Sequence, residues 1–289
     1  MAVGRVSTEQ SEVAASLFGM TASPPTRSAL REHLVASRIA GNVATTRQNN
    51  LEHFDRMSRR EPNYLFGLEP VGRWSFDDVL AVMARSCGVS PDARHRSGQD
   101  TIDPELTLDR LDAMARRISL AARRQDRVLL ATGHPHGLRP VYEAVASALR
   151  SAGCSLLTPA AGWQHPAGTP YGSDGQQIRY VSSGVAVLSS GHVLHHTHSP
   201  EPMRAALAAL DSTGAGLPDL VVGDHGWAGA AGQAGIEALG FADSNDPALF
   251  VGETEGKVAV CVPLDDNVAP HLYDPMIAYL LDRAALPPT

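Results

Sequence analysis

The chain has 289 residues, enough to bury a full core in one large α/β domain or two small ones. Its 24 Lys and Arg against 31 Asp and Glu give a formal net charge of −7, which argues against a protein that binds nucleic acid by neutralising phosphates. Lys257 is its single lysine, which excludes a Walker-type phosphate loop and disfavours Schiff-base chemistry.

The composition also bears on location. The three cysteines are scattered and form no Cys-x-x-Cys pair, so neither a disulfide framework nor a cysteine-type zinc site is expected. No run of about 18 apolar residues predicts a membrane span, and Glu9 and Glu12 occupy the region where a signal peptide would be basic and then apolar. We predict a cytoplasmic protein that binds neither membrane nor nucleic acid. Residues 1–26 are expected to be a flexible leader, because Pro24 and Pro25 resist helix and central strand.

The first part of the predicted domain, residues 27–125, is expected to be helical. Apolar residues recur at helical spacing from Ser28 to about Phe54 and predict a helix followed by a polar turn. A second helix is predicted over 76–85, with two acidic residues in its first turn. A third helix follows, with Thr107 as its expected cap.

The second part, residues 126–289, is expected to hold the sheet of the same single α/β domain. An apolar run over 127–132 ends in a glycine-bearing loop, and a helical stretch over 141–149 follows it. Strands and helices then alternate, which predicts a mostly parallel, Rossmann-like sheet with helices on both faces. Further strands are expected at 177–181, 185–188, 193–196, 219–223 and 257–263, and helices near 201–210, 227–239 and 273–285. A Gly- and Pro-rich insert, 159–175, is predicted to be a flexible loop or lid.

Two histidine clusters lie where such strands end, which is where α/β sheets bind ligands. His134 follows Gly133 between a strand and a helix, so backbone N–H groups there can hold an oxyanion. The alternative is a plain turn with exposed histidines. In the stretch 195–199, His196 and His198 would point to the same side of an extended chain, as metal ligands or phosphate donors would. The alternative is one buried histidine among solvated ones.

A third motif delivers Asp224 and His225 from an apolar strand into a glycine-rich turn. Asp224 is the preferred metal ligand or acid/base, and helix capping is its alternative role. A turn downstream is dense in oxygen ligands suited to Mg²⁺, or else it is an Asx turn that starts a helix: Asp243, Asn245 and Asp246. Asp265 and Asp266 repeat this chemistry as a weaker signal, because acidic turns are common on surfaces.

Several hydrolase signatures are absent, among them Asp-x-Asp-x-Thr, Cys-x5-Arg, Arg-His-Gly, Gly-x-Ser-x-Gly and His-Glu-x-x-His. The combination of motifs present nevertheless resembles a family of high-GC Gram-positive bacterial proteins labelled simply as phosphatases, over about residues 28–285. The chain is more distantly similar to the metal-dependent damage-control phosphatases, although it has Asp224-His225 where those carry Asp-Asn. The resemblance is carried by segments 38–41, 47–50, 98–105, 132–135, 196–203, 224–229, 245–248 and 263–266.

The residues and the resemblance together predict a metal-dependent phosphatase that acts on a phosphomonoester of a small metabolite, such as a sugar phosphate or a nucleotide. The expected cofactor is Mg²⁺, with Mn²⁺ or Co²⁺ as substitutes. Imidazoles near neutral pH suit phosphate binding or protonation of the leaving oxygen. The predicted catalytic residues are Asp224, His225, His198 and His134; the metal ligands are Asp224, Asp243, Asn245 and Asp246; the substrate-binding residues are Arg47, Asn50, Arg96, Gly133, His196 and Ser199.

Two functions from other classes use the same residues. A His/Asp metallohydrolase would hold zinc and cleave an amide or ester without a phosphate. A non-catalytic protein would bind a nucleotide or sugar phosphate in the same loops without turning it over. A small phosphorylated molecule is the expected partner in two of the three hypotheses, and homo-oligomer formation is compatible with all of them.

Overall fold

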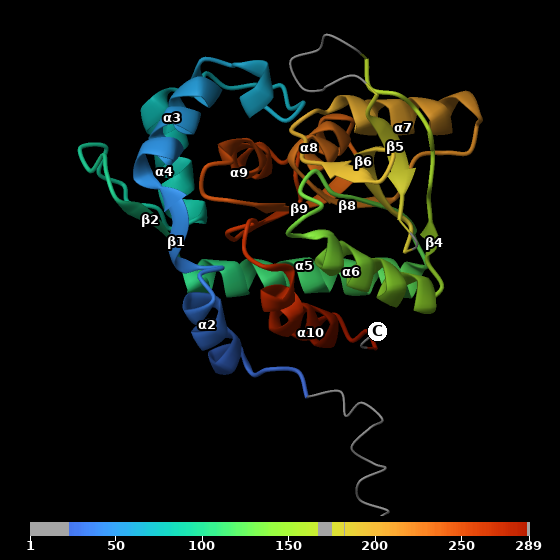
Figure 1. The fold of residues 1–289 in the computed structure, drawn as a ribbon, viewed down its shortest axis with the longest axis horizontal. Helices are drawn as coiled ribbons and strands as arrows, with labels where there is room; N and C mark the ends of the chain where they lie inside the picture. The colour runs from blue at the N-terminus through green and yellow to red at the C-terminus, as the bar shows by residue number, and fades with distance from the viewer. Residues whose placement is uncertain (1–22, 167–174, 182, 288–289) are drawn as a thin grey trace, which may run out of the picture.

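The computed structural model describes residues 23–166, 175–181 and 183–287, and its centre is an eight-stranded sheet (Figure 1). Five strands run parallel in the order β10-β9-β8-β3-β6, while β5 and β7 pair antiparallel with β6 and short β4 pairs with β3. Helices α5 and α6 cover one face, with α10 packed against them, and α7 and α8 cover the other. The predicted α/β class, with a mostly parallel sheet between helices, is confirmed.

The sheet part alternates strands and helices as its sequence predicts. Strand β8 is buried along its whole length, which is typical of a parallel strand covered on both faces. Its elements are β3 (Arg127–Ala131), α6 (Arg139–Ser151), β4 (Ser155–Leu156), β5 (Gln177–Tyr180), β6 (Val185–Ser190), β7 (Val193–His195), α7 (Glu201–Ser212), β8 (Leu220–Asp224), α8 (His225–Gln233), β9 (Glu237–Ala242), α9 (Pro247–Thr254), β10 (Val260–Pro263), η2 (Pro270–Tyr273) and α10 (Asp274–Arg283).

The part before β3 is mainly helical, with strong local signals at its helix ends. Ser75 and Asp78 form a capping box at the start of α4, and Asp103 with Pro104 starts α5, four residues before the predicted cap Thr107. The elements are α2 (Arg27–Ala36), β1 (Gly41–Thr46), α3 (Arg47–Ser58), η1 (Pro62–Tyr64), α4 (Phe76–Ser86), β2 (Gln99–Ile102) and α5 (Pro104–Arg124).

Two predicted helices were wrong in part. The helical pattern over 28–54 is interrupted by β1, which pairs with β2, so that Gly41 faces Ile102 across a long stretch of chain. The helix predicted over 227–239 ends at Gln233, and β9 follows it between β8 and β10. Strand β1, which has one buried residue among six, was missed because its pairing with β2 is non-local. Strand β9 was missed because a nearly fully buried strand has no period that separates it from a buried helix.

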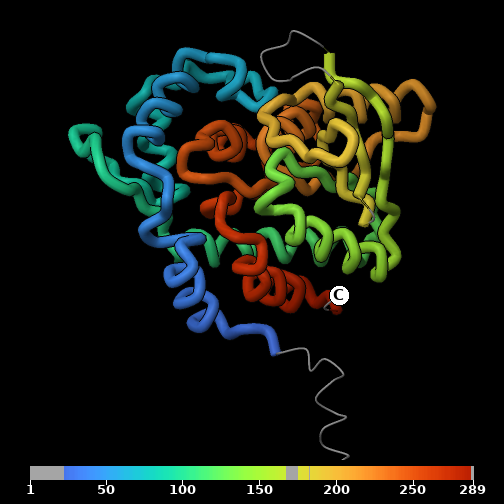
Figure 2. The backbone as a smooth tube through the Cα atoms, in the orientation of Figure 1, coloured from blue at the N-terminus to red at the C-terminus, as the bar shows by residue number. Residues whose placement is uncertain are grey.

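The helical part and the sheet share one apolar core. A single cluster of buried side chains includes Leu30 and Phe54 from the first part and Val128 and Val260 from the sheet. Helix α9 contacts α3 and α4 on one side and β9 and β10 on the other, as the tube trace also shows (Figure 2). The helical part therefore lies directly against the sheet edge at which β9 and β10 end.

Some sequence predictions fall outside the described residues. These are most of the predicted leader, residues 1–22, and the middle of the predicted loop or lid, residues 167–174. In the described ranges, the helices lack the combination of length and apolar character that crossing a membrane would require.

Candidate active site at the carboxyl edge of the sheet

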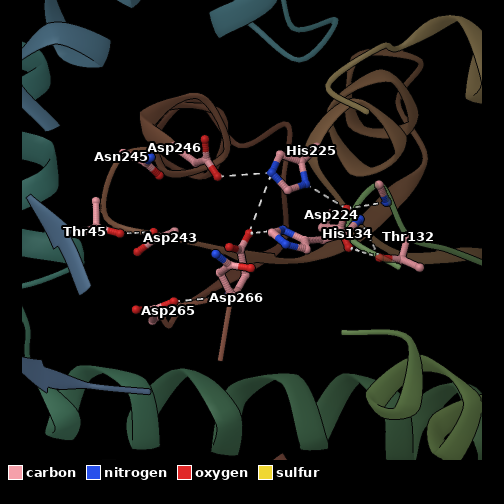
Figure 3. A network of polar contacts seen from close by, with 12 residues as sticks. Thr45, Thr132, His134, Asp224, His225, Asp243, Asn245, Asp246, Asp265 and Asp266 are labelled. Carbon is pink, nitrogen blue, oxygen red and sulfur yellow. Dashed lines mark hydrogen bonds and ion pairs between the residues drawn. The ribbon is translucent and has the colours of Figure 1, made fainter. Parts of the chain in front are cut away.

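Five polar loops meet where β3, β8, β9 and β10 end and where the chain leaves β7 (Figure 3). Parallel neighbouring strands bring their carboxyl ends to one edge, so residues far apart in sequence become neighbours. We call this cluster the His/Asp site. It contains Thr132, Gly133 and His134, then His196 and His198, Asp224 and His225, Asp243 and Asp246, and Asp265 and Asp266.

Asp224 is fully buried at the end of β8, and both of its carboxylate oxygens accept hydrogen bonds. Its Oδ2 accepts a hydrogen bond from Thr132 Oγ1 at 2.6 Å, and its Oδ1 accepts one from the Gly133 N–H at 2.6 Å. Oδ1 also lies 2.9 Å from His225 Nδ1. Burial alone would raise the pKa of Asp224, but its contacts with His225, Thr132 and Gly133 lower it, so Asp224 is a stable carboxylate.

His225 turns its other ring nitrogen toward two further carboxylates. Its Nε2 lies 3.2 Å from Asp246 Oδ2 and 3.7 Å from Asp266 Oδ2. Burial opposes protonation of this imidazole, but the charges of Asp246 and Asp224 outweigh burial and raise its pKa well above the usual value. The backbone of His225 has a φ of 43°, an uncommon conformation for a non-glycine residue, and such strain concentrates at functional sites.

Two glycines permit the loops to approach one another. A Cβ on Gly133 would lie 2.3 Å from the carbonyl oxygen of Thr197, and one on Gly226 would lie 2.2 Å from that of Ser199. The loop after β3 and the first turn of α8 therefore both pack against the backbone of the 196–199 segment. This packing places His198 next to His225.

The four imidazoles form a contiguous group. His134 stacks on His196 with ring centroids 4.6 Å apart, and His198 stacks on His225 at 4.8 Å. Burial disfavours the charged form of His134, but Asp266, whose Oδ2 lies 3.1 Å from Nδ1, raises its pKa. Loss of hydration around the rings and the nearby imidazoles lower the pKa of His196, which keeps an exposed side, and lower that of His198 to about 4. Two neutral imidazoles are thus available as ligands beside two that favour a proton.

A second, acidic part of the site lies where β9 and β10 end. Asp243, Asp265 and Asp266 are nearly buried, and each offers an oxygen within 4.8 Å of the others. Strand β1 contacts this part, because Thr45 Oγ1 donates to Asp243 Oδ2 at 2.5 Å and the Ala44 N–H donates to Asp265 Oδ2 at 3.1 Å. Burial and the charges of Asp266 and Asp265 raise the pKa of Asp243 well above its usual value.

Three residue groups in the described part of the chain have the composition and spacing to hold a metal ion. The donor sets fit metals, since imidazole suits transition ions and carboxylate oxygens suit Mg²⁺ or Mn²⁺. His198 Nδ1 is buried and has no partner of full hydrogen-bond geometry within the described residues, although the backbone of Asn63 lies close enough to affect the ring. The groups are His134, His196 and His225; His198, His225 and Asp246; and Asp243, Asp265 and Asp266.

Two residues predicted to bind substrate, Arg47 and Asn50, lie outside the His/Asp site. Both contact the buried carboxylate of Asp100. Arg47 is 0% exposed, and its Nη1 lies 2.8 Å from Asp100 Oδ2. Its other nitrogens donate to the carbonyl oxygens of His95 and Asp92, and Asn50 Nδ2 donates to Asp100 at 2.9 Å. These contacts fix the 92–100 loop and leave Arg47 without solvent-facing surface.

The other predicted residues have mixed surroundings. Ser199 is buried, accepts a hydrogen bond from the Glu201 N–H and lies 2.8 Å from His165 Nε2, so it joins the start of α7 to the 159–175 insert. Asn245 donates its amide to Asn49 of α3 at 2.6 Å. His196 is exposed at the site. Arg96 is exposed as well, and lines a surface cavity of about 640 Å³ with Gln48, Leu51, Glu52, Asp55 and Phe76.

Sequence reasoning left four contributors out of the predicted site. Thr132 was noted only within the segment 132–135, and Thr45 carried no signal, since a threonine near a strand end has no distinctive pattern. Asp265 and Asp266 were noted as a weaker signal, and the position of β10 beside β9 is what brings them to Asp243.

With the geometry established, comparison with known proteins shows the family. The family model described as Phosphatase matches residues 25–288, and the chain belongs to this family. A protein of Streptomyces coelicolor that is named as a phosphatase is 52% identical over 266 residues, covering 91% of this chain and 97% of the relative. The predicted resemblance to a phosphatase family of high-GC Gram-positive bacteria is confirmed.

Proposed function

We propose that the chain is a divalent-metal-dependent phosphatase that hydrolyses a phosphomonoester of a small metabolite. One observation carries the proposal: five carboxylates gather in the His/Asp site, and their ion pairs within the described residues are with histidines. None of these pairs joins them to an Arg or Lys. The cluster consists of Asp224, Asp243, Asp246, Asp265 and Asp266.

The charge of this cluster argues for bound cations. A phosphate ester carries up to two negative charges, and a buried cluster with excess carboxylates repels it. Divalent ions held by these carboxylates and histidines would reverse the sign of the site, and would supply an activated water and neutralise phosphoryl oxygens. This reasoning favours a metal-dependent enzyme over a protein that binds phosphorylated ligands through its loops alone.

The side chains take distinct roles in this proposal. Asp224 holds His225 through Nδ1 and leaves Nε2 directed at Asp246, where it would bind a cation, as carboxylates behind metal-bound histidines do. Asp266 raises the pKa of His134, which favours its protonated form, and His134 would donate this proton to the leaving oxygen. His196 is exposed and would contact the substrate.

We therefore revise three roles inferred from the sequence. Asp224 orients His225 instead of binding the ion, because it belongs to none of the three groups whose spacing suits a metal and its oxygens hold Thr132, Gly133 and His225. Asn245 supports its turn through Asn49, and Arg47 stabilises the helical part. Mg²⁺ is the proposed ion, with Mn²⁺ or Co²⁺ as substitutes, and the cytoplasm is the proposed location.

The test is phosphate release from a panel of sugar phosphates, nucleotides and other phosphorylated metabolites. Each substrate is assayed with Mg²⁺, Mn²⁺ or Co²⁺ and again with EDTA. We expect release that EDTA abolishes and added metal restores. His225→Ala should lower the rate by about 1,000-fold or more, whereas His271→Ala, at an exposed histidine of η2, should leave it unchanged.

Three results would contradict the proposal. Phosphate release that persists undiminished in EDTA would show that the reaction requires no metal ion. Hydrolysis of esters or amides that lack phosphate, with silence across the panel, would indicate the metallohydrolase instead. Binding of phosphorylated ligands without turnover under every metal would indicate a non-catalytic protein.

A further inference from the structure

We infer that the His/Asp site holds two divalent ions at once, one on His225 and one on a separate carboxylate group, with Asp266 between them. The carboxylate group is Asp243, Asp265 and Asp266. The inference rests on the proposed function and specifies how its metal centre is built.

The histidine-containing groups provide for one ion only. Both include His225, and its Nδ1 is held by Asp224 at 2.9 Å. Nε2 is therefore the one ring nitrogen that can bind a metal, and a cation there would displace the proton that the carboxylates favour. The imidazole nitrogen then offers a single lone pair. An ion on Nε2 takes its other ligands either from His134 and His196 or from His198 and Asp246. The two groups are alternatives and cannot be filled together.

The carboxylate group shares no residue with either of them. Its members are 5%, 1% and 5% exposed for Asp243, Asp265 and Asp266, so their mutual repulsion is poorly screened by water. The side chain of His134, which is not a member of the carboxylate group, is directed at it. His134 is 92% buried, and its Nδ1 makes no hydrogen bond of good geometry with a described residue although Asp266 Oδ2 lies 3.1 Å away.

Asp266 contacts both halves of the site. Its Oδ2 lies 3.1 Å from His134 Nδ1 and 3.7 Å from His225 Nε2, while the same side chain belongs to the carboxylate group (Figure 3). Carboxylates commonly bridge paired ions, and paired ions stabilise both the attacking and the leaving oxygen of a phosphoryl transfer. The donor types differ between the halves, so the position on His225 favours a transition ion and the carboxylate group favours Mg²⁺ or Mn²⁺.

Metal content tests this inference without reference to activity. The full chain is dialysed against Mn²⁺, freed of excess ion and analysed by mass spectrometry for manganese per chain. We expect two equivalents in the wild type, one in His225→Ala, one in Asp243→Asn and none in the double variant. Asp211→Asn, at an exposed position of α7, is the matched control and should retain two.

Electron paramagnetic resonance gives a second readout, because two adjacent Mn²⁺ ions couple magnetically. We expect coupling in the wild type and its loss in each single variant. If circular dichroism shows that Asp243→Asn is unfolded, Asp265→Asn replaces it. A single equivalent in the wild type, or two equivalents in a folded variant of the carboxylate group, would overturn the inference.

The two proposals fail in different ways. Two coupled ions without phosphate release from any substrate would refute the proposed function and leave the two-ion site standing. Metal-dependent release from a chain that binds one equivalent would refute the two-ion site and leave the function standing.

Discussion

Two regions of this protein bury carboxylates, and they treat them in opposite ways. In the helical part, Asp100 is 1% exposed and is neutralised by Arg47, with Asn50 as a further donor. In the His/Asp site, Asp243 and Asp266 are equally buried, yet burial and neighbouring negative charges raise the pKa of both.

The two regions differ in whether a buried carboxylate has an arginine partner among the described residues. Burial would raise the pKa of Asp100, but Arg47 and Asn50 lower it, so this carboxylate is stable in the folded chain. Within the described residues the acidic part of the His/Asp site has no arginine or lysine partner, and under the proposed function bound cations would offset the cost of burying it. Such a site is expected to be less stable than the rest of the molecule until cations bind.

The largest effect on stability should come from breaking the buried ion pair between Arg47 and Asp100. Arg47→Met leaves Asp100 buried without a cation and should lower the free energy of unfolding by about 3–5 kcal/mol. The measurement is urea unfolding of the metal-free protein at neutral pH. The double variant Arg47→Met/Asp100→Leu should lose less than Arg47→Met alone, and an equal or greater loss would show that the pair contributes little.

The same pair predicts a pH dependence. The folded pKa of Asp100 is depressed, so its stabilisation is present above the unfolded value of about 3.9 and is lost as the pH falls through the folded value. Unfolding measured between pH 6 and pH 2 should show a loss of stability that Arg47→Met and Asp100→Leu both reduce. An acid limb that is unchanged in both variants would contradict this assignment.

Cation binding should stabilise the opposite region. Metal at about 100 times its dissociation constant should raise the free energy of unfolding by about 2.7 kcal/mol for each site. Thermal unfolding with and without Mg²⁺ or Mn²⁺ measures the effect, and EDTA should reverse it. Arg47→Met should keep the full metal-induced shift, because it acts outside the site, whereas a shift lost in that variant would couple the two regions.

A smaller effect of opposite sign is expected for a carboxylate of the site. Asp243→Asn removes a carboxyl group whose ionisation the folded chain disfavours, and should stabilise the metal-free protein by about 1 kcal/mol at neutral pH. The folded pKa of Asp243 is raised, so its contribution to stability is present below pH 3.9 and is lost as the pH rises toward the folded value. In Asp243→Asn, the free energy of unfolding should therefore fall less as the pH rises. Destabilisation by Asp243→Asn at neutral pH would show that its hydrogen bonds with Thr45 and Ser244 outweigh the repulsion.

The smallest effect is predicted for an exposed pair in the loop that Arg47 holds. Arg94 Nε lies 3.0 Å from Asp92 Oδ1, but the Arg94 side chain is 92% exposed. Arg94→Ala should change the free energy of unfolding by about 0.5 kcal/mol or less. A loss comparable to that of Arg47→Met would mean that the loop, and not the burial of charge, determines the result.

The positions of polar residues could be predicted better than their contacts. His134, His198, Asp224, His225 and Asp246 were predicted from a local pattern, polar side chains directly after buried strands, and the structure brings them together. The engagement of Asp224 by Thr132 was not predictable, because 92 residues separate the two side chains. In the same way Arg47 resembled a phosphate ligand from sequence, and its partner Asp100 lies 53 residues further along the chain.

The sequence by itself determined the fold class, most of the helices and strands, and the loops in which chemistry is concentrated. These depend on hydrophobic runs, capping residues and turn residues that act over a few positions. The tertiary structure alone decided that β1 and β9 are strands, that five loops meet at one edge, and which buried carboxylates have an arginine partner. Strand pairing and electrostatic attraction act through space, so their outcome depends on distances that only the folded chain establishes.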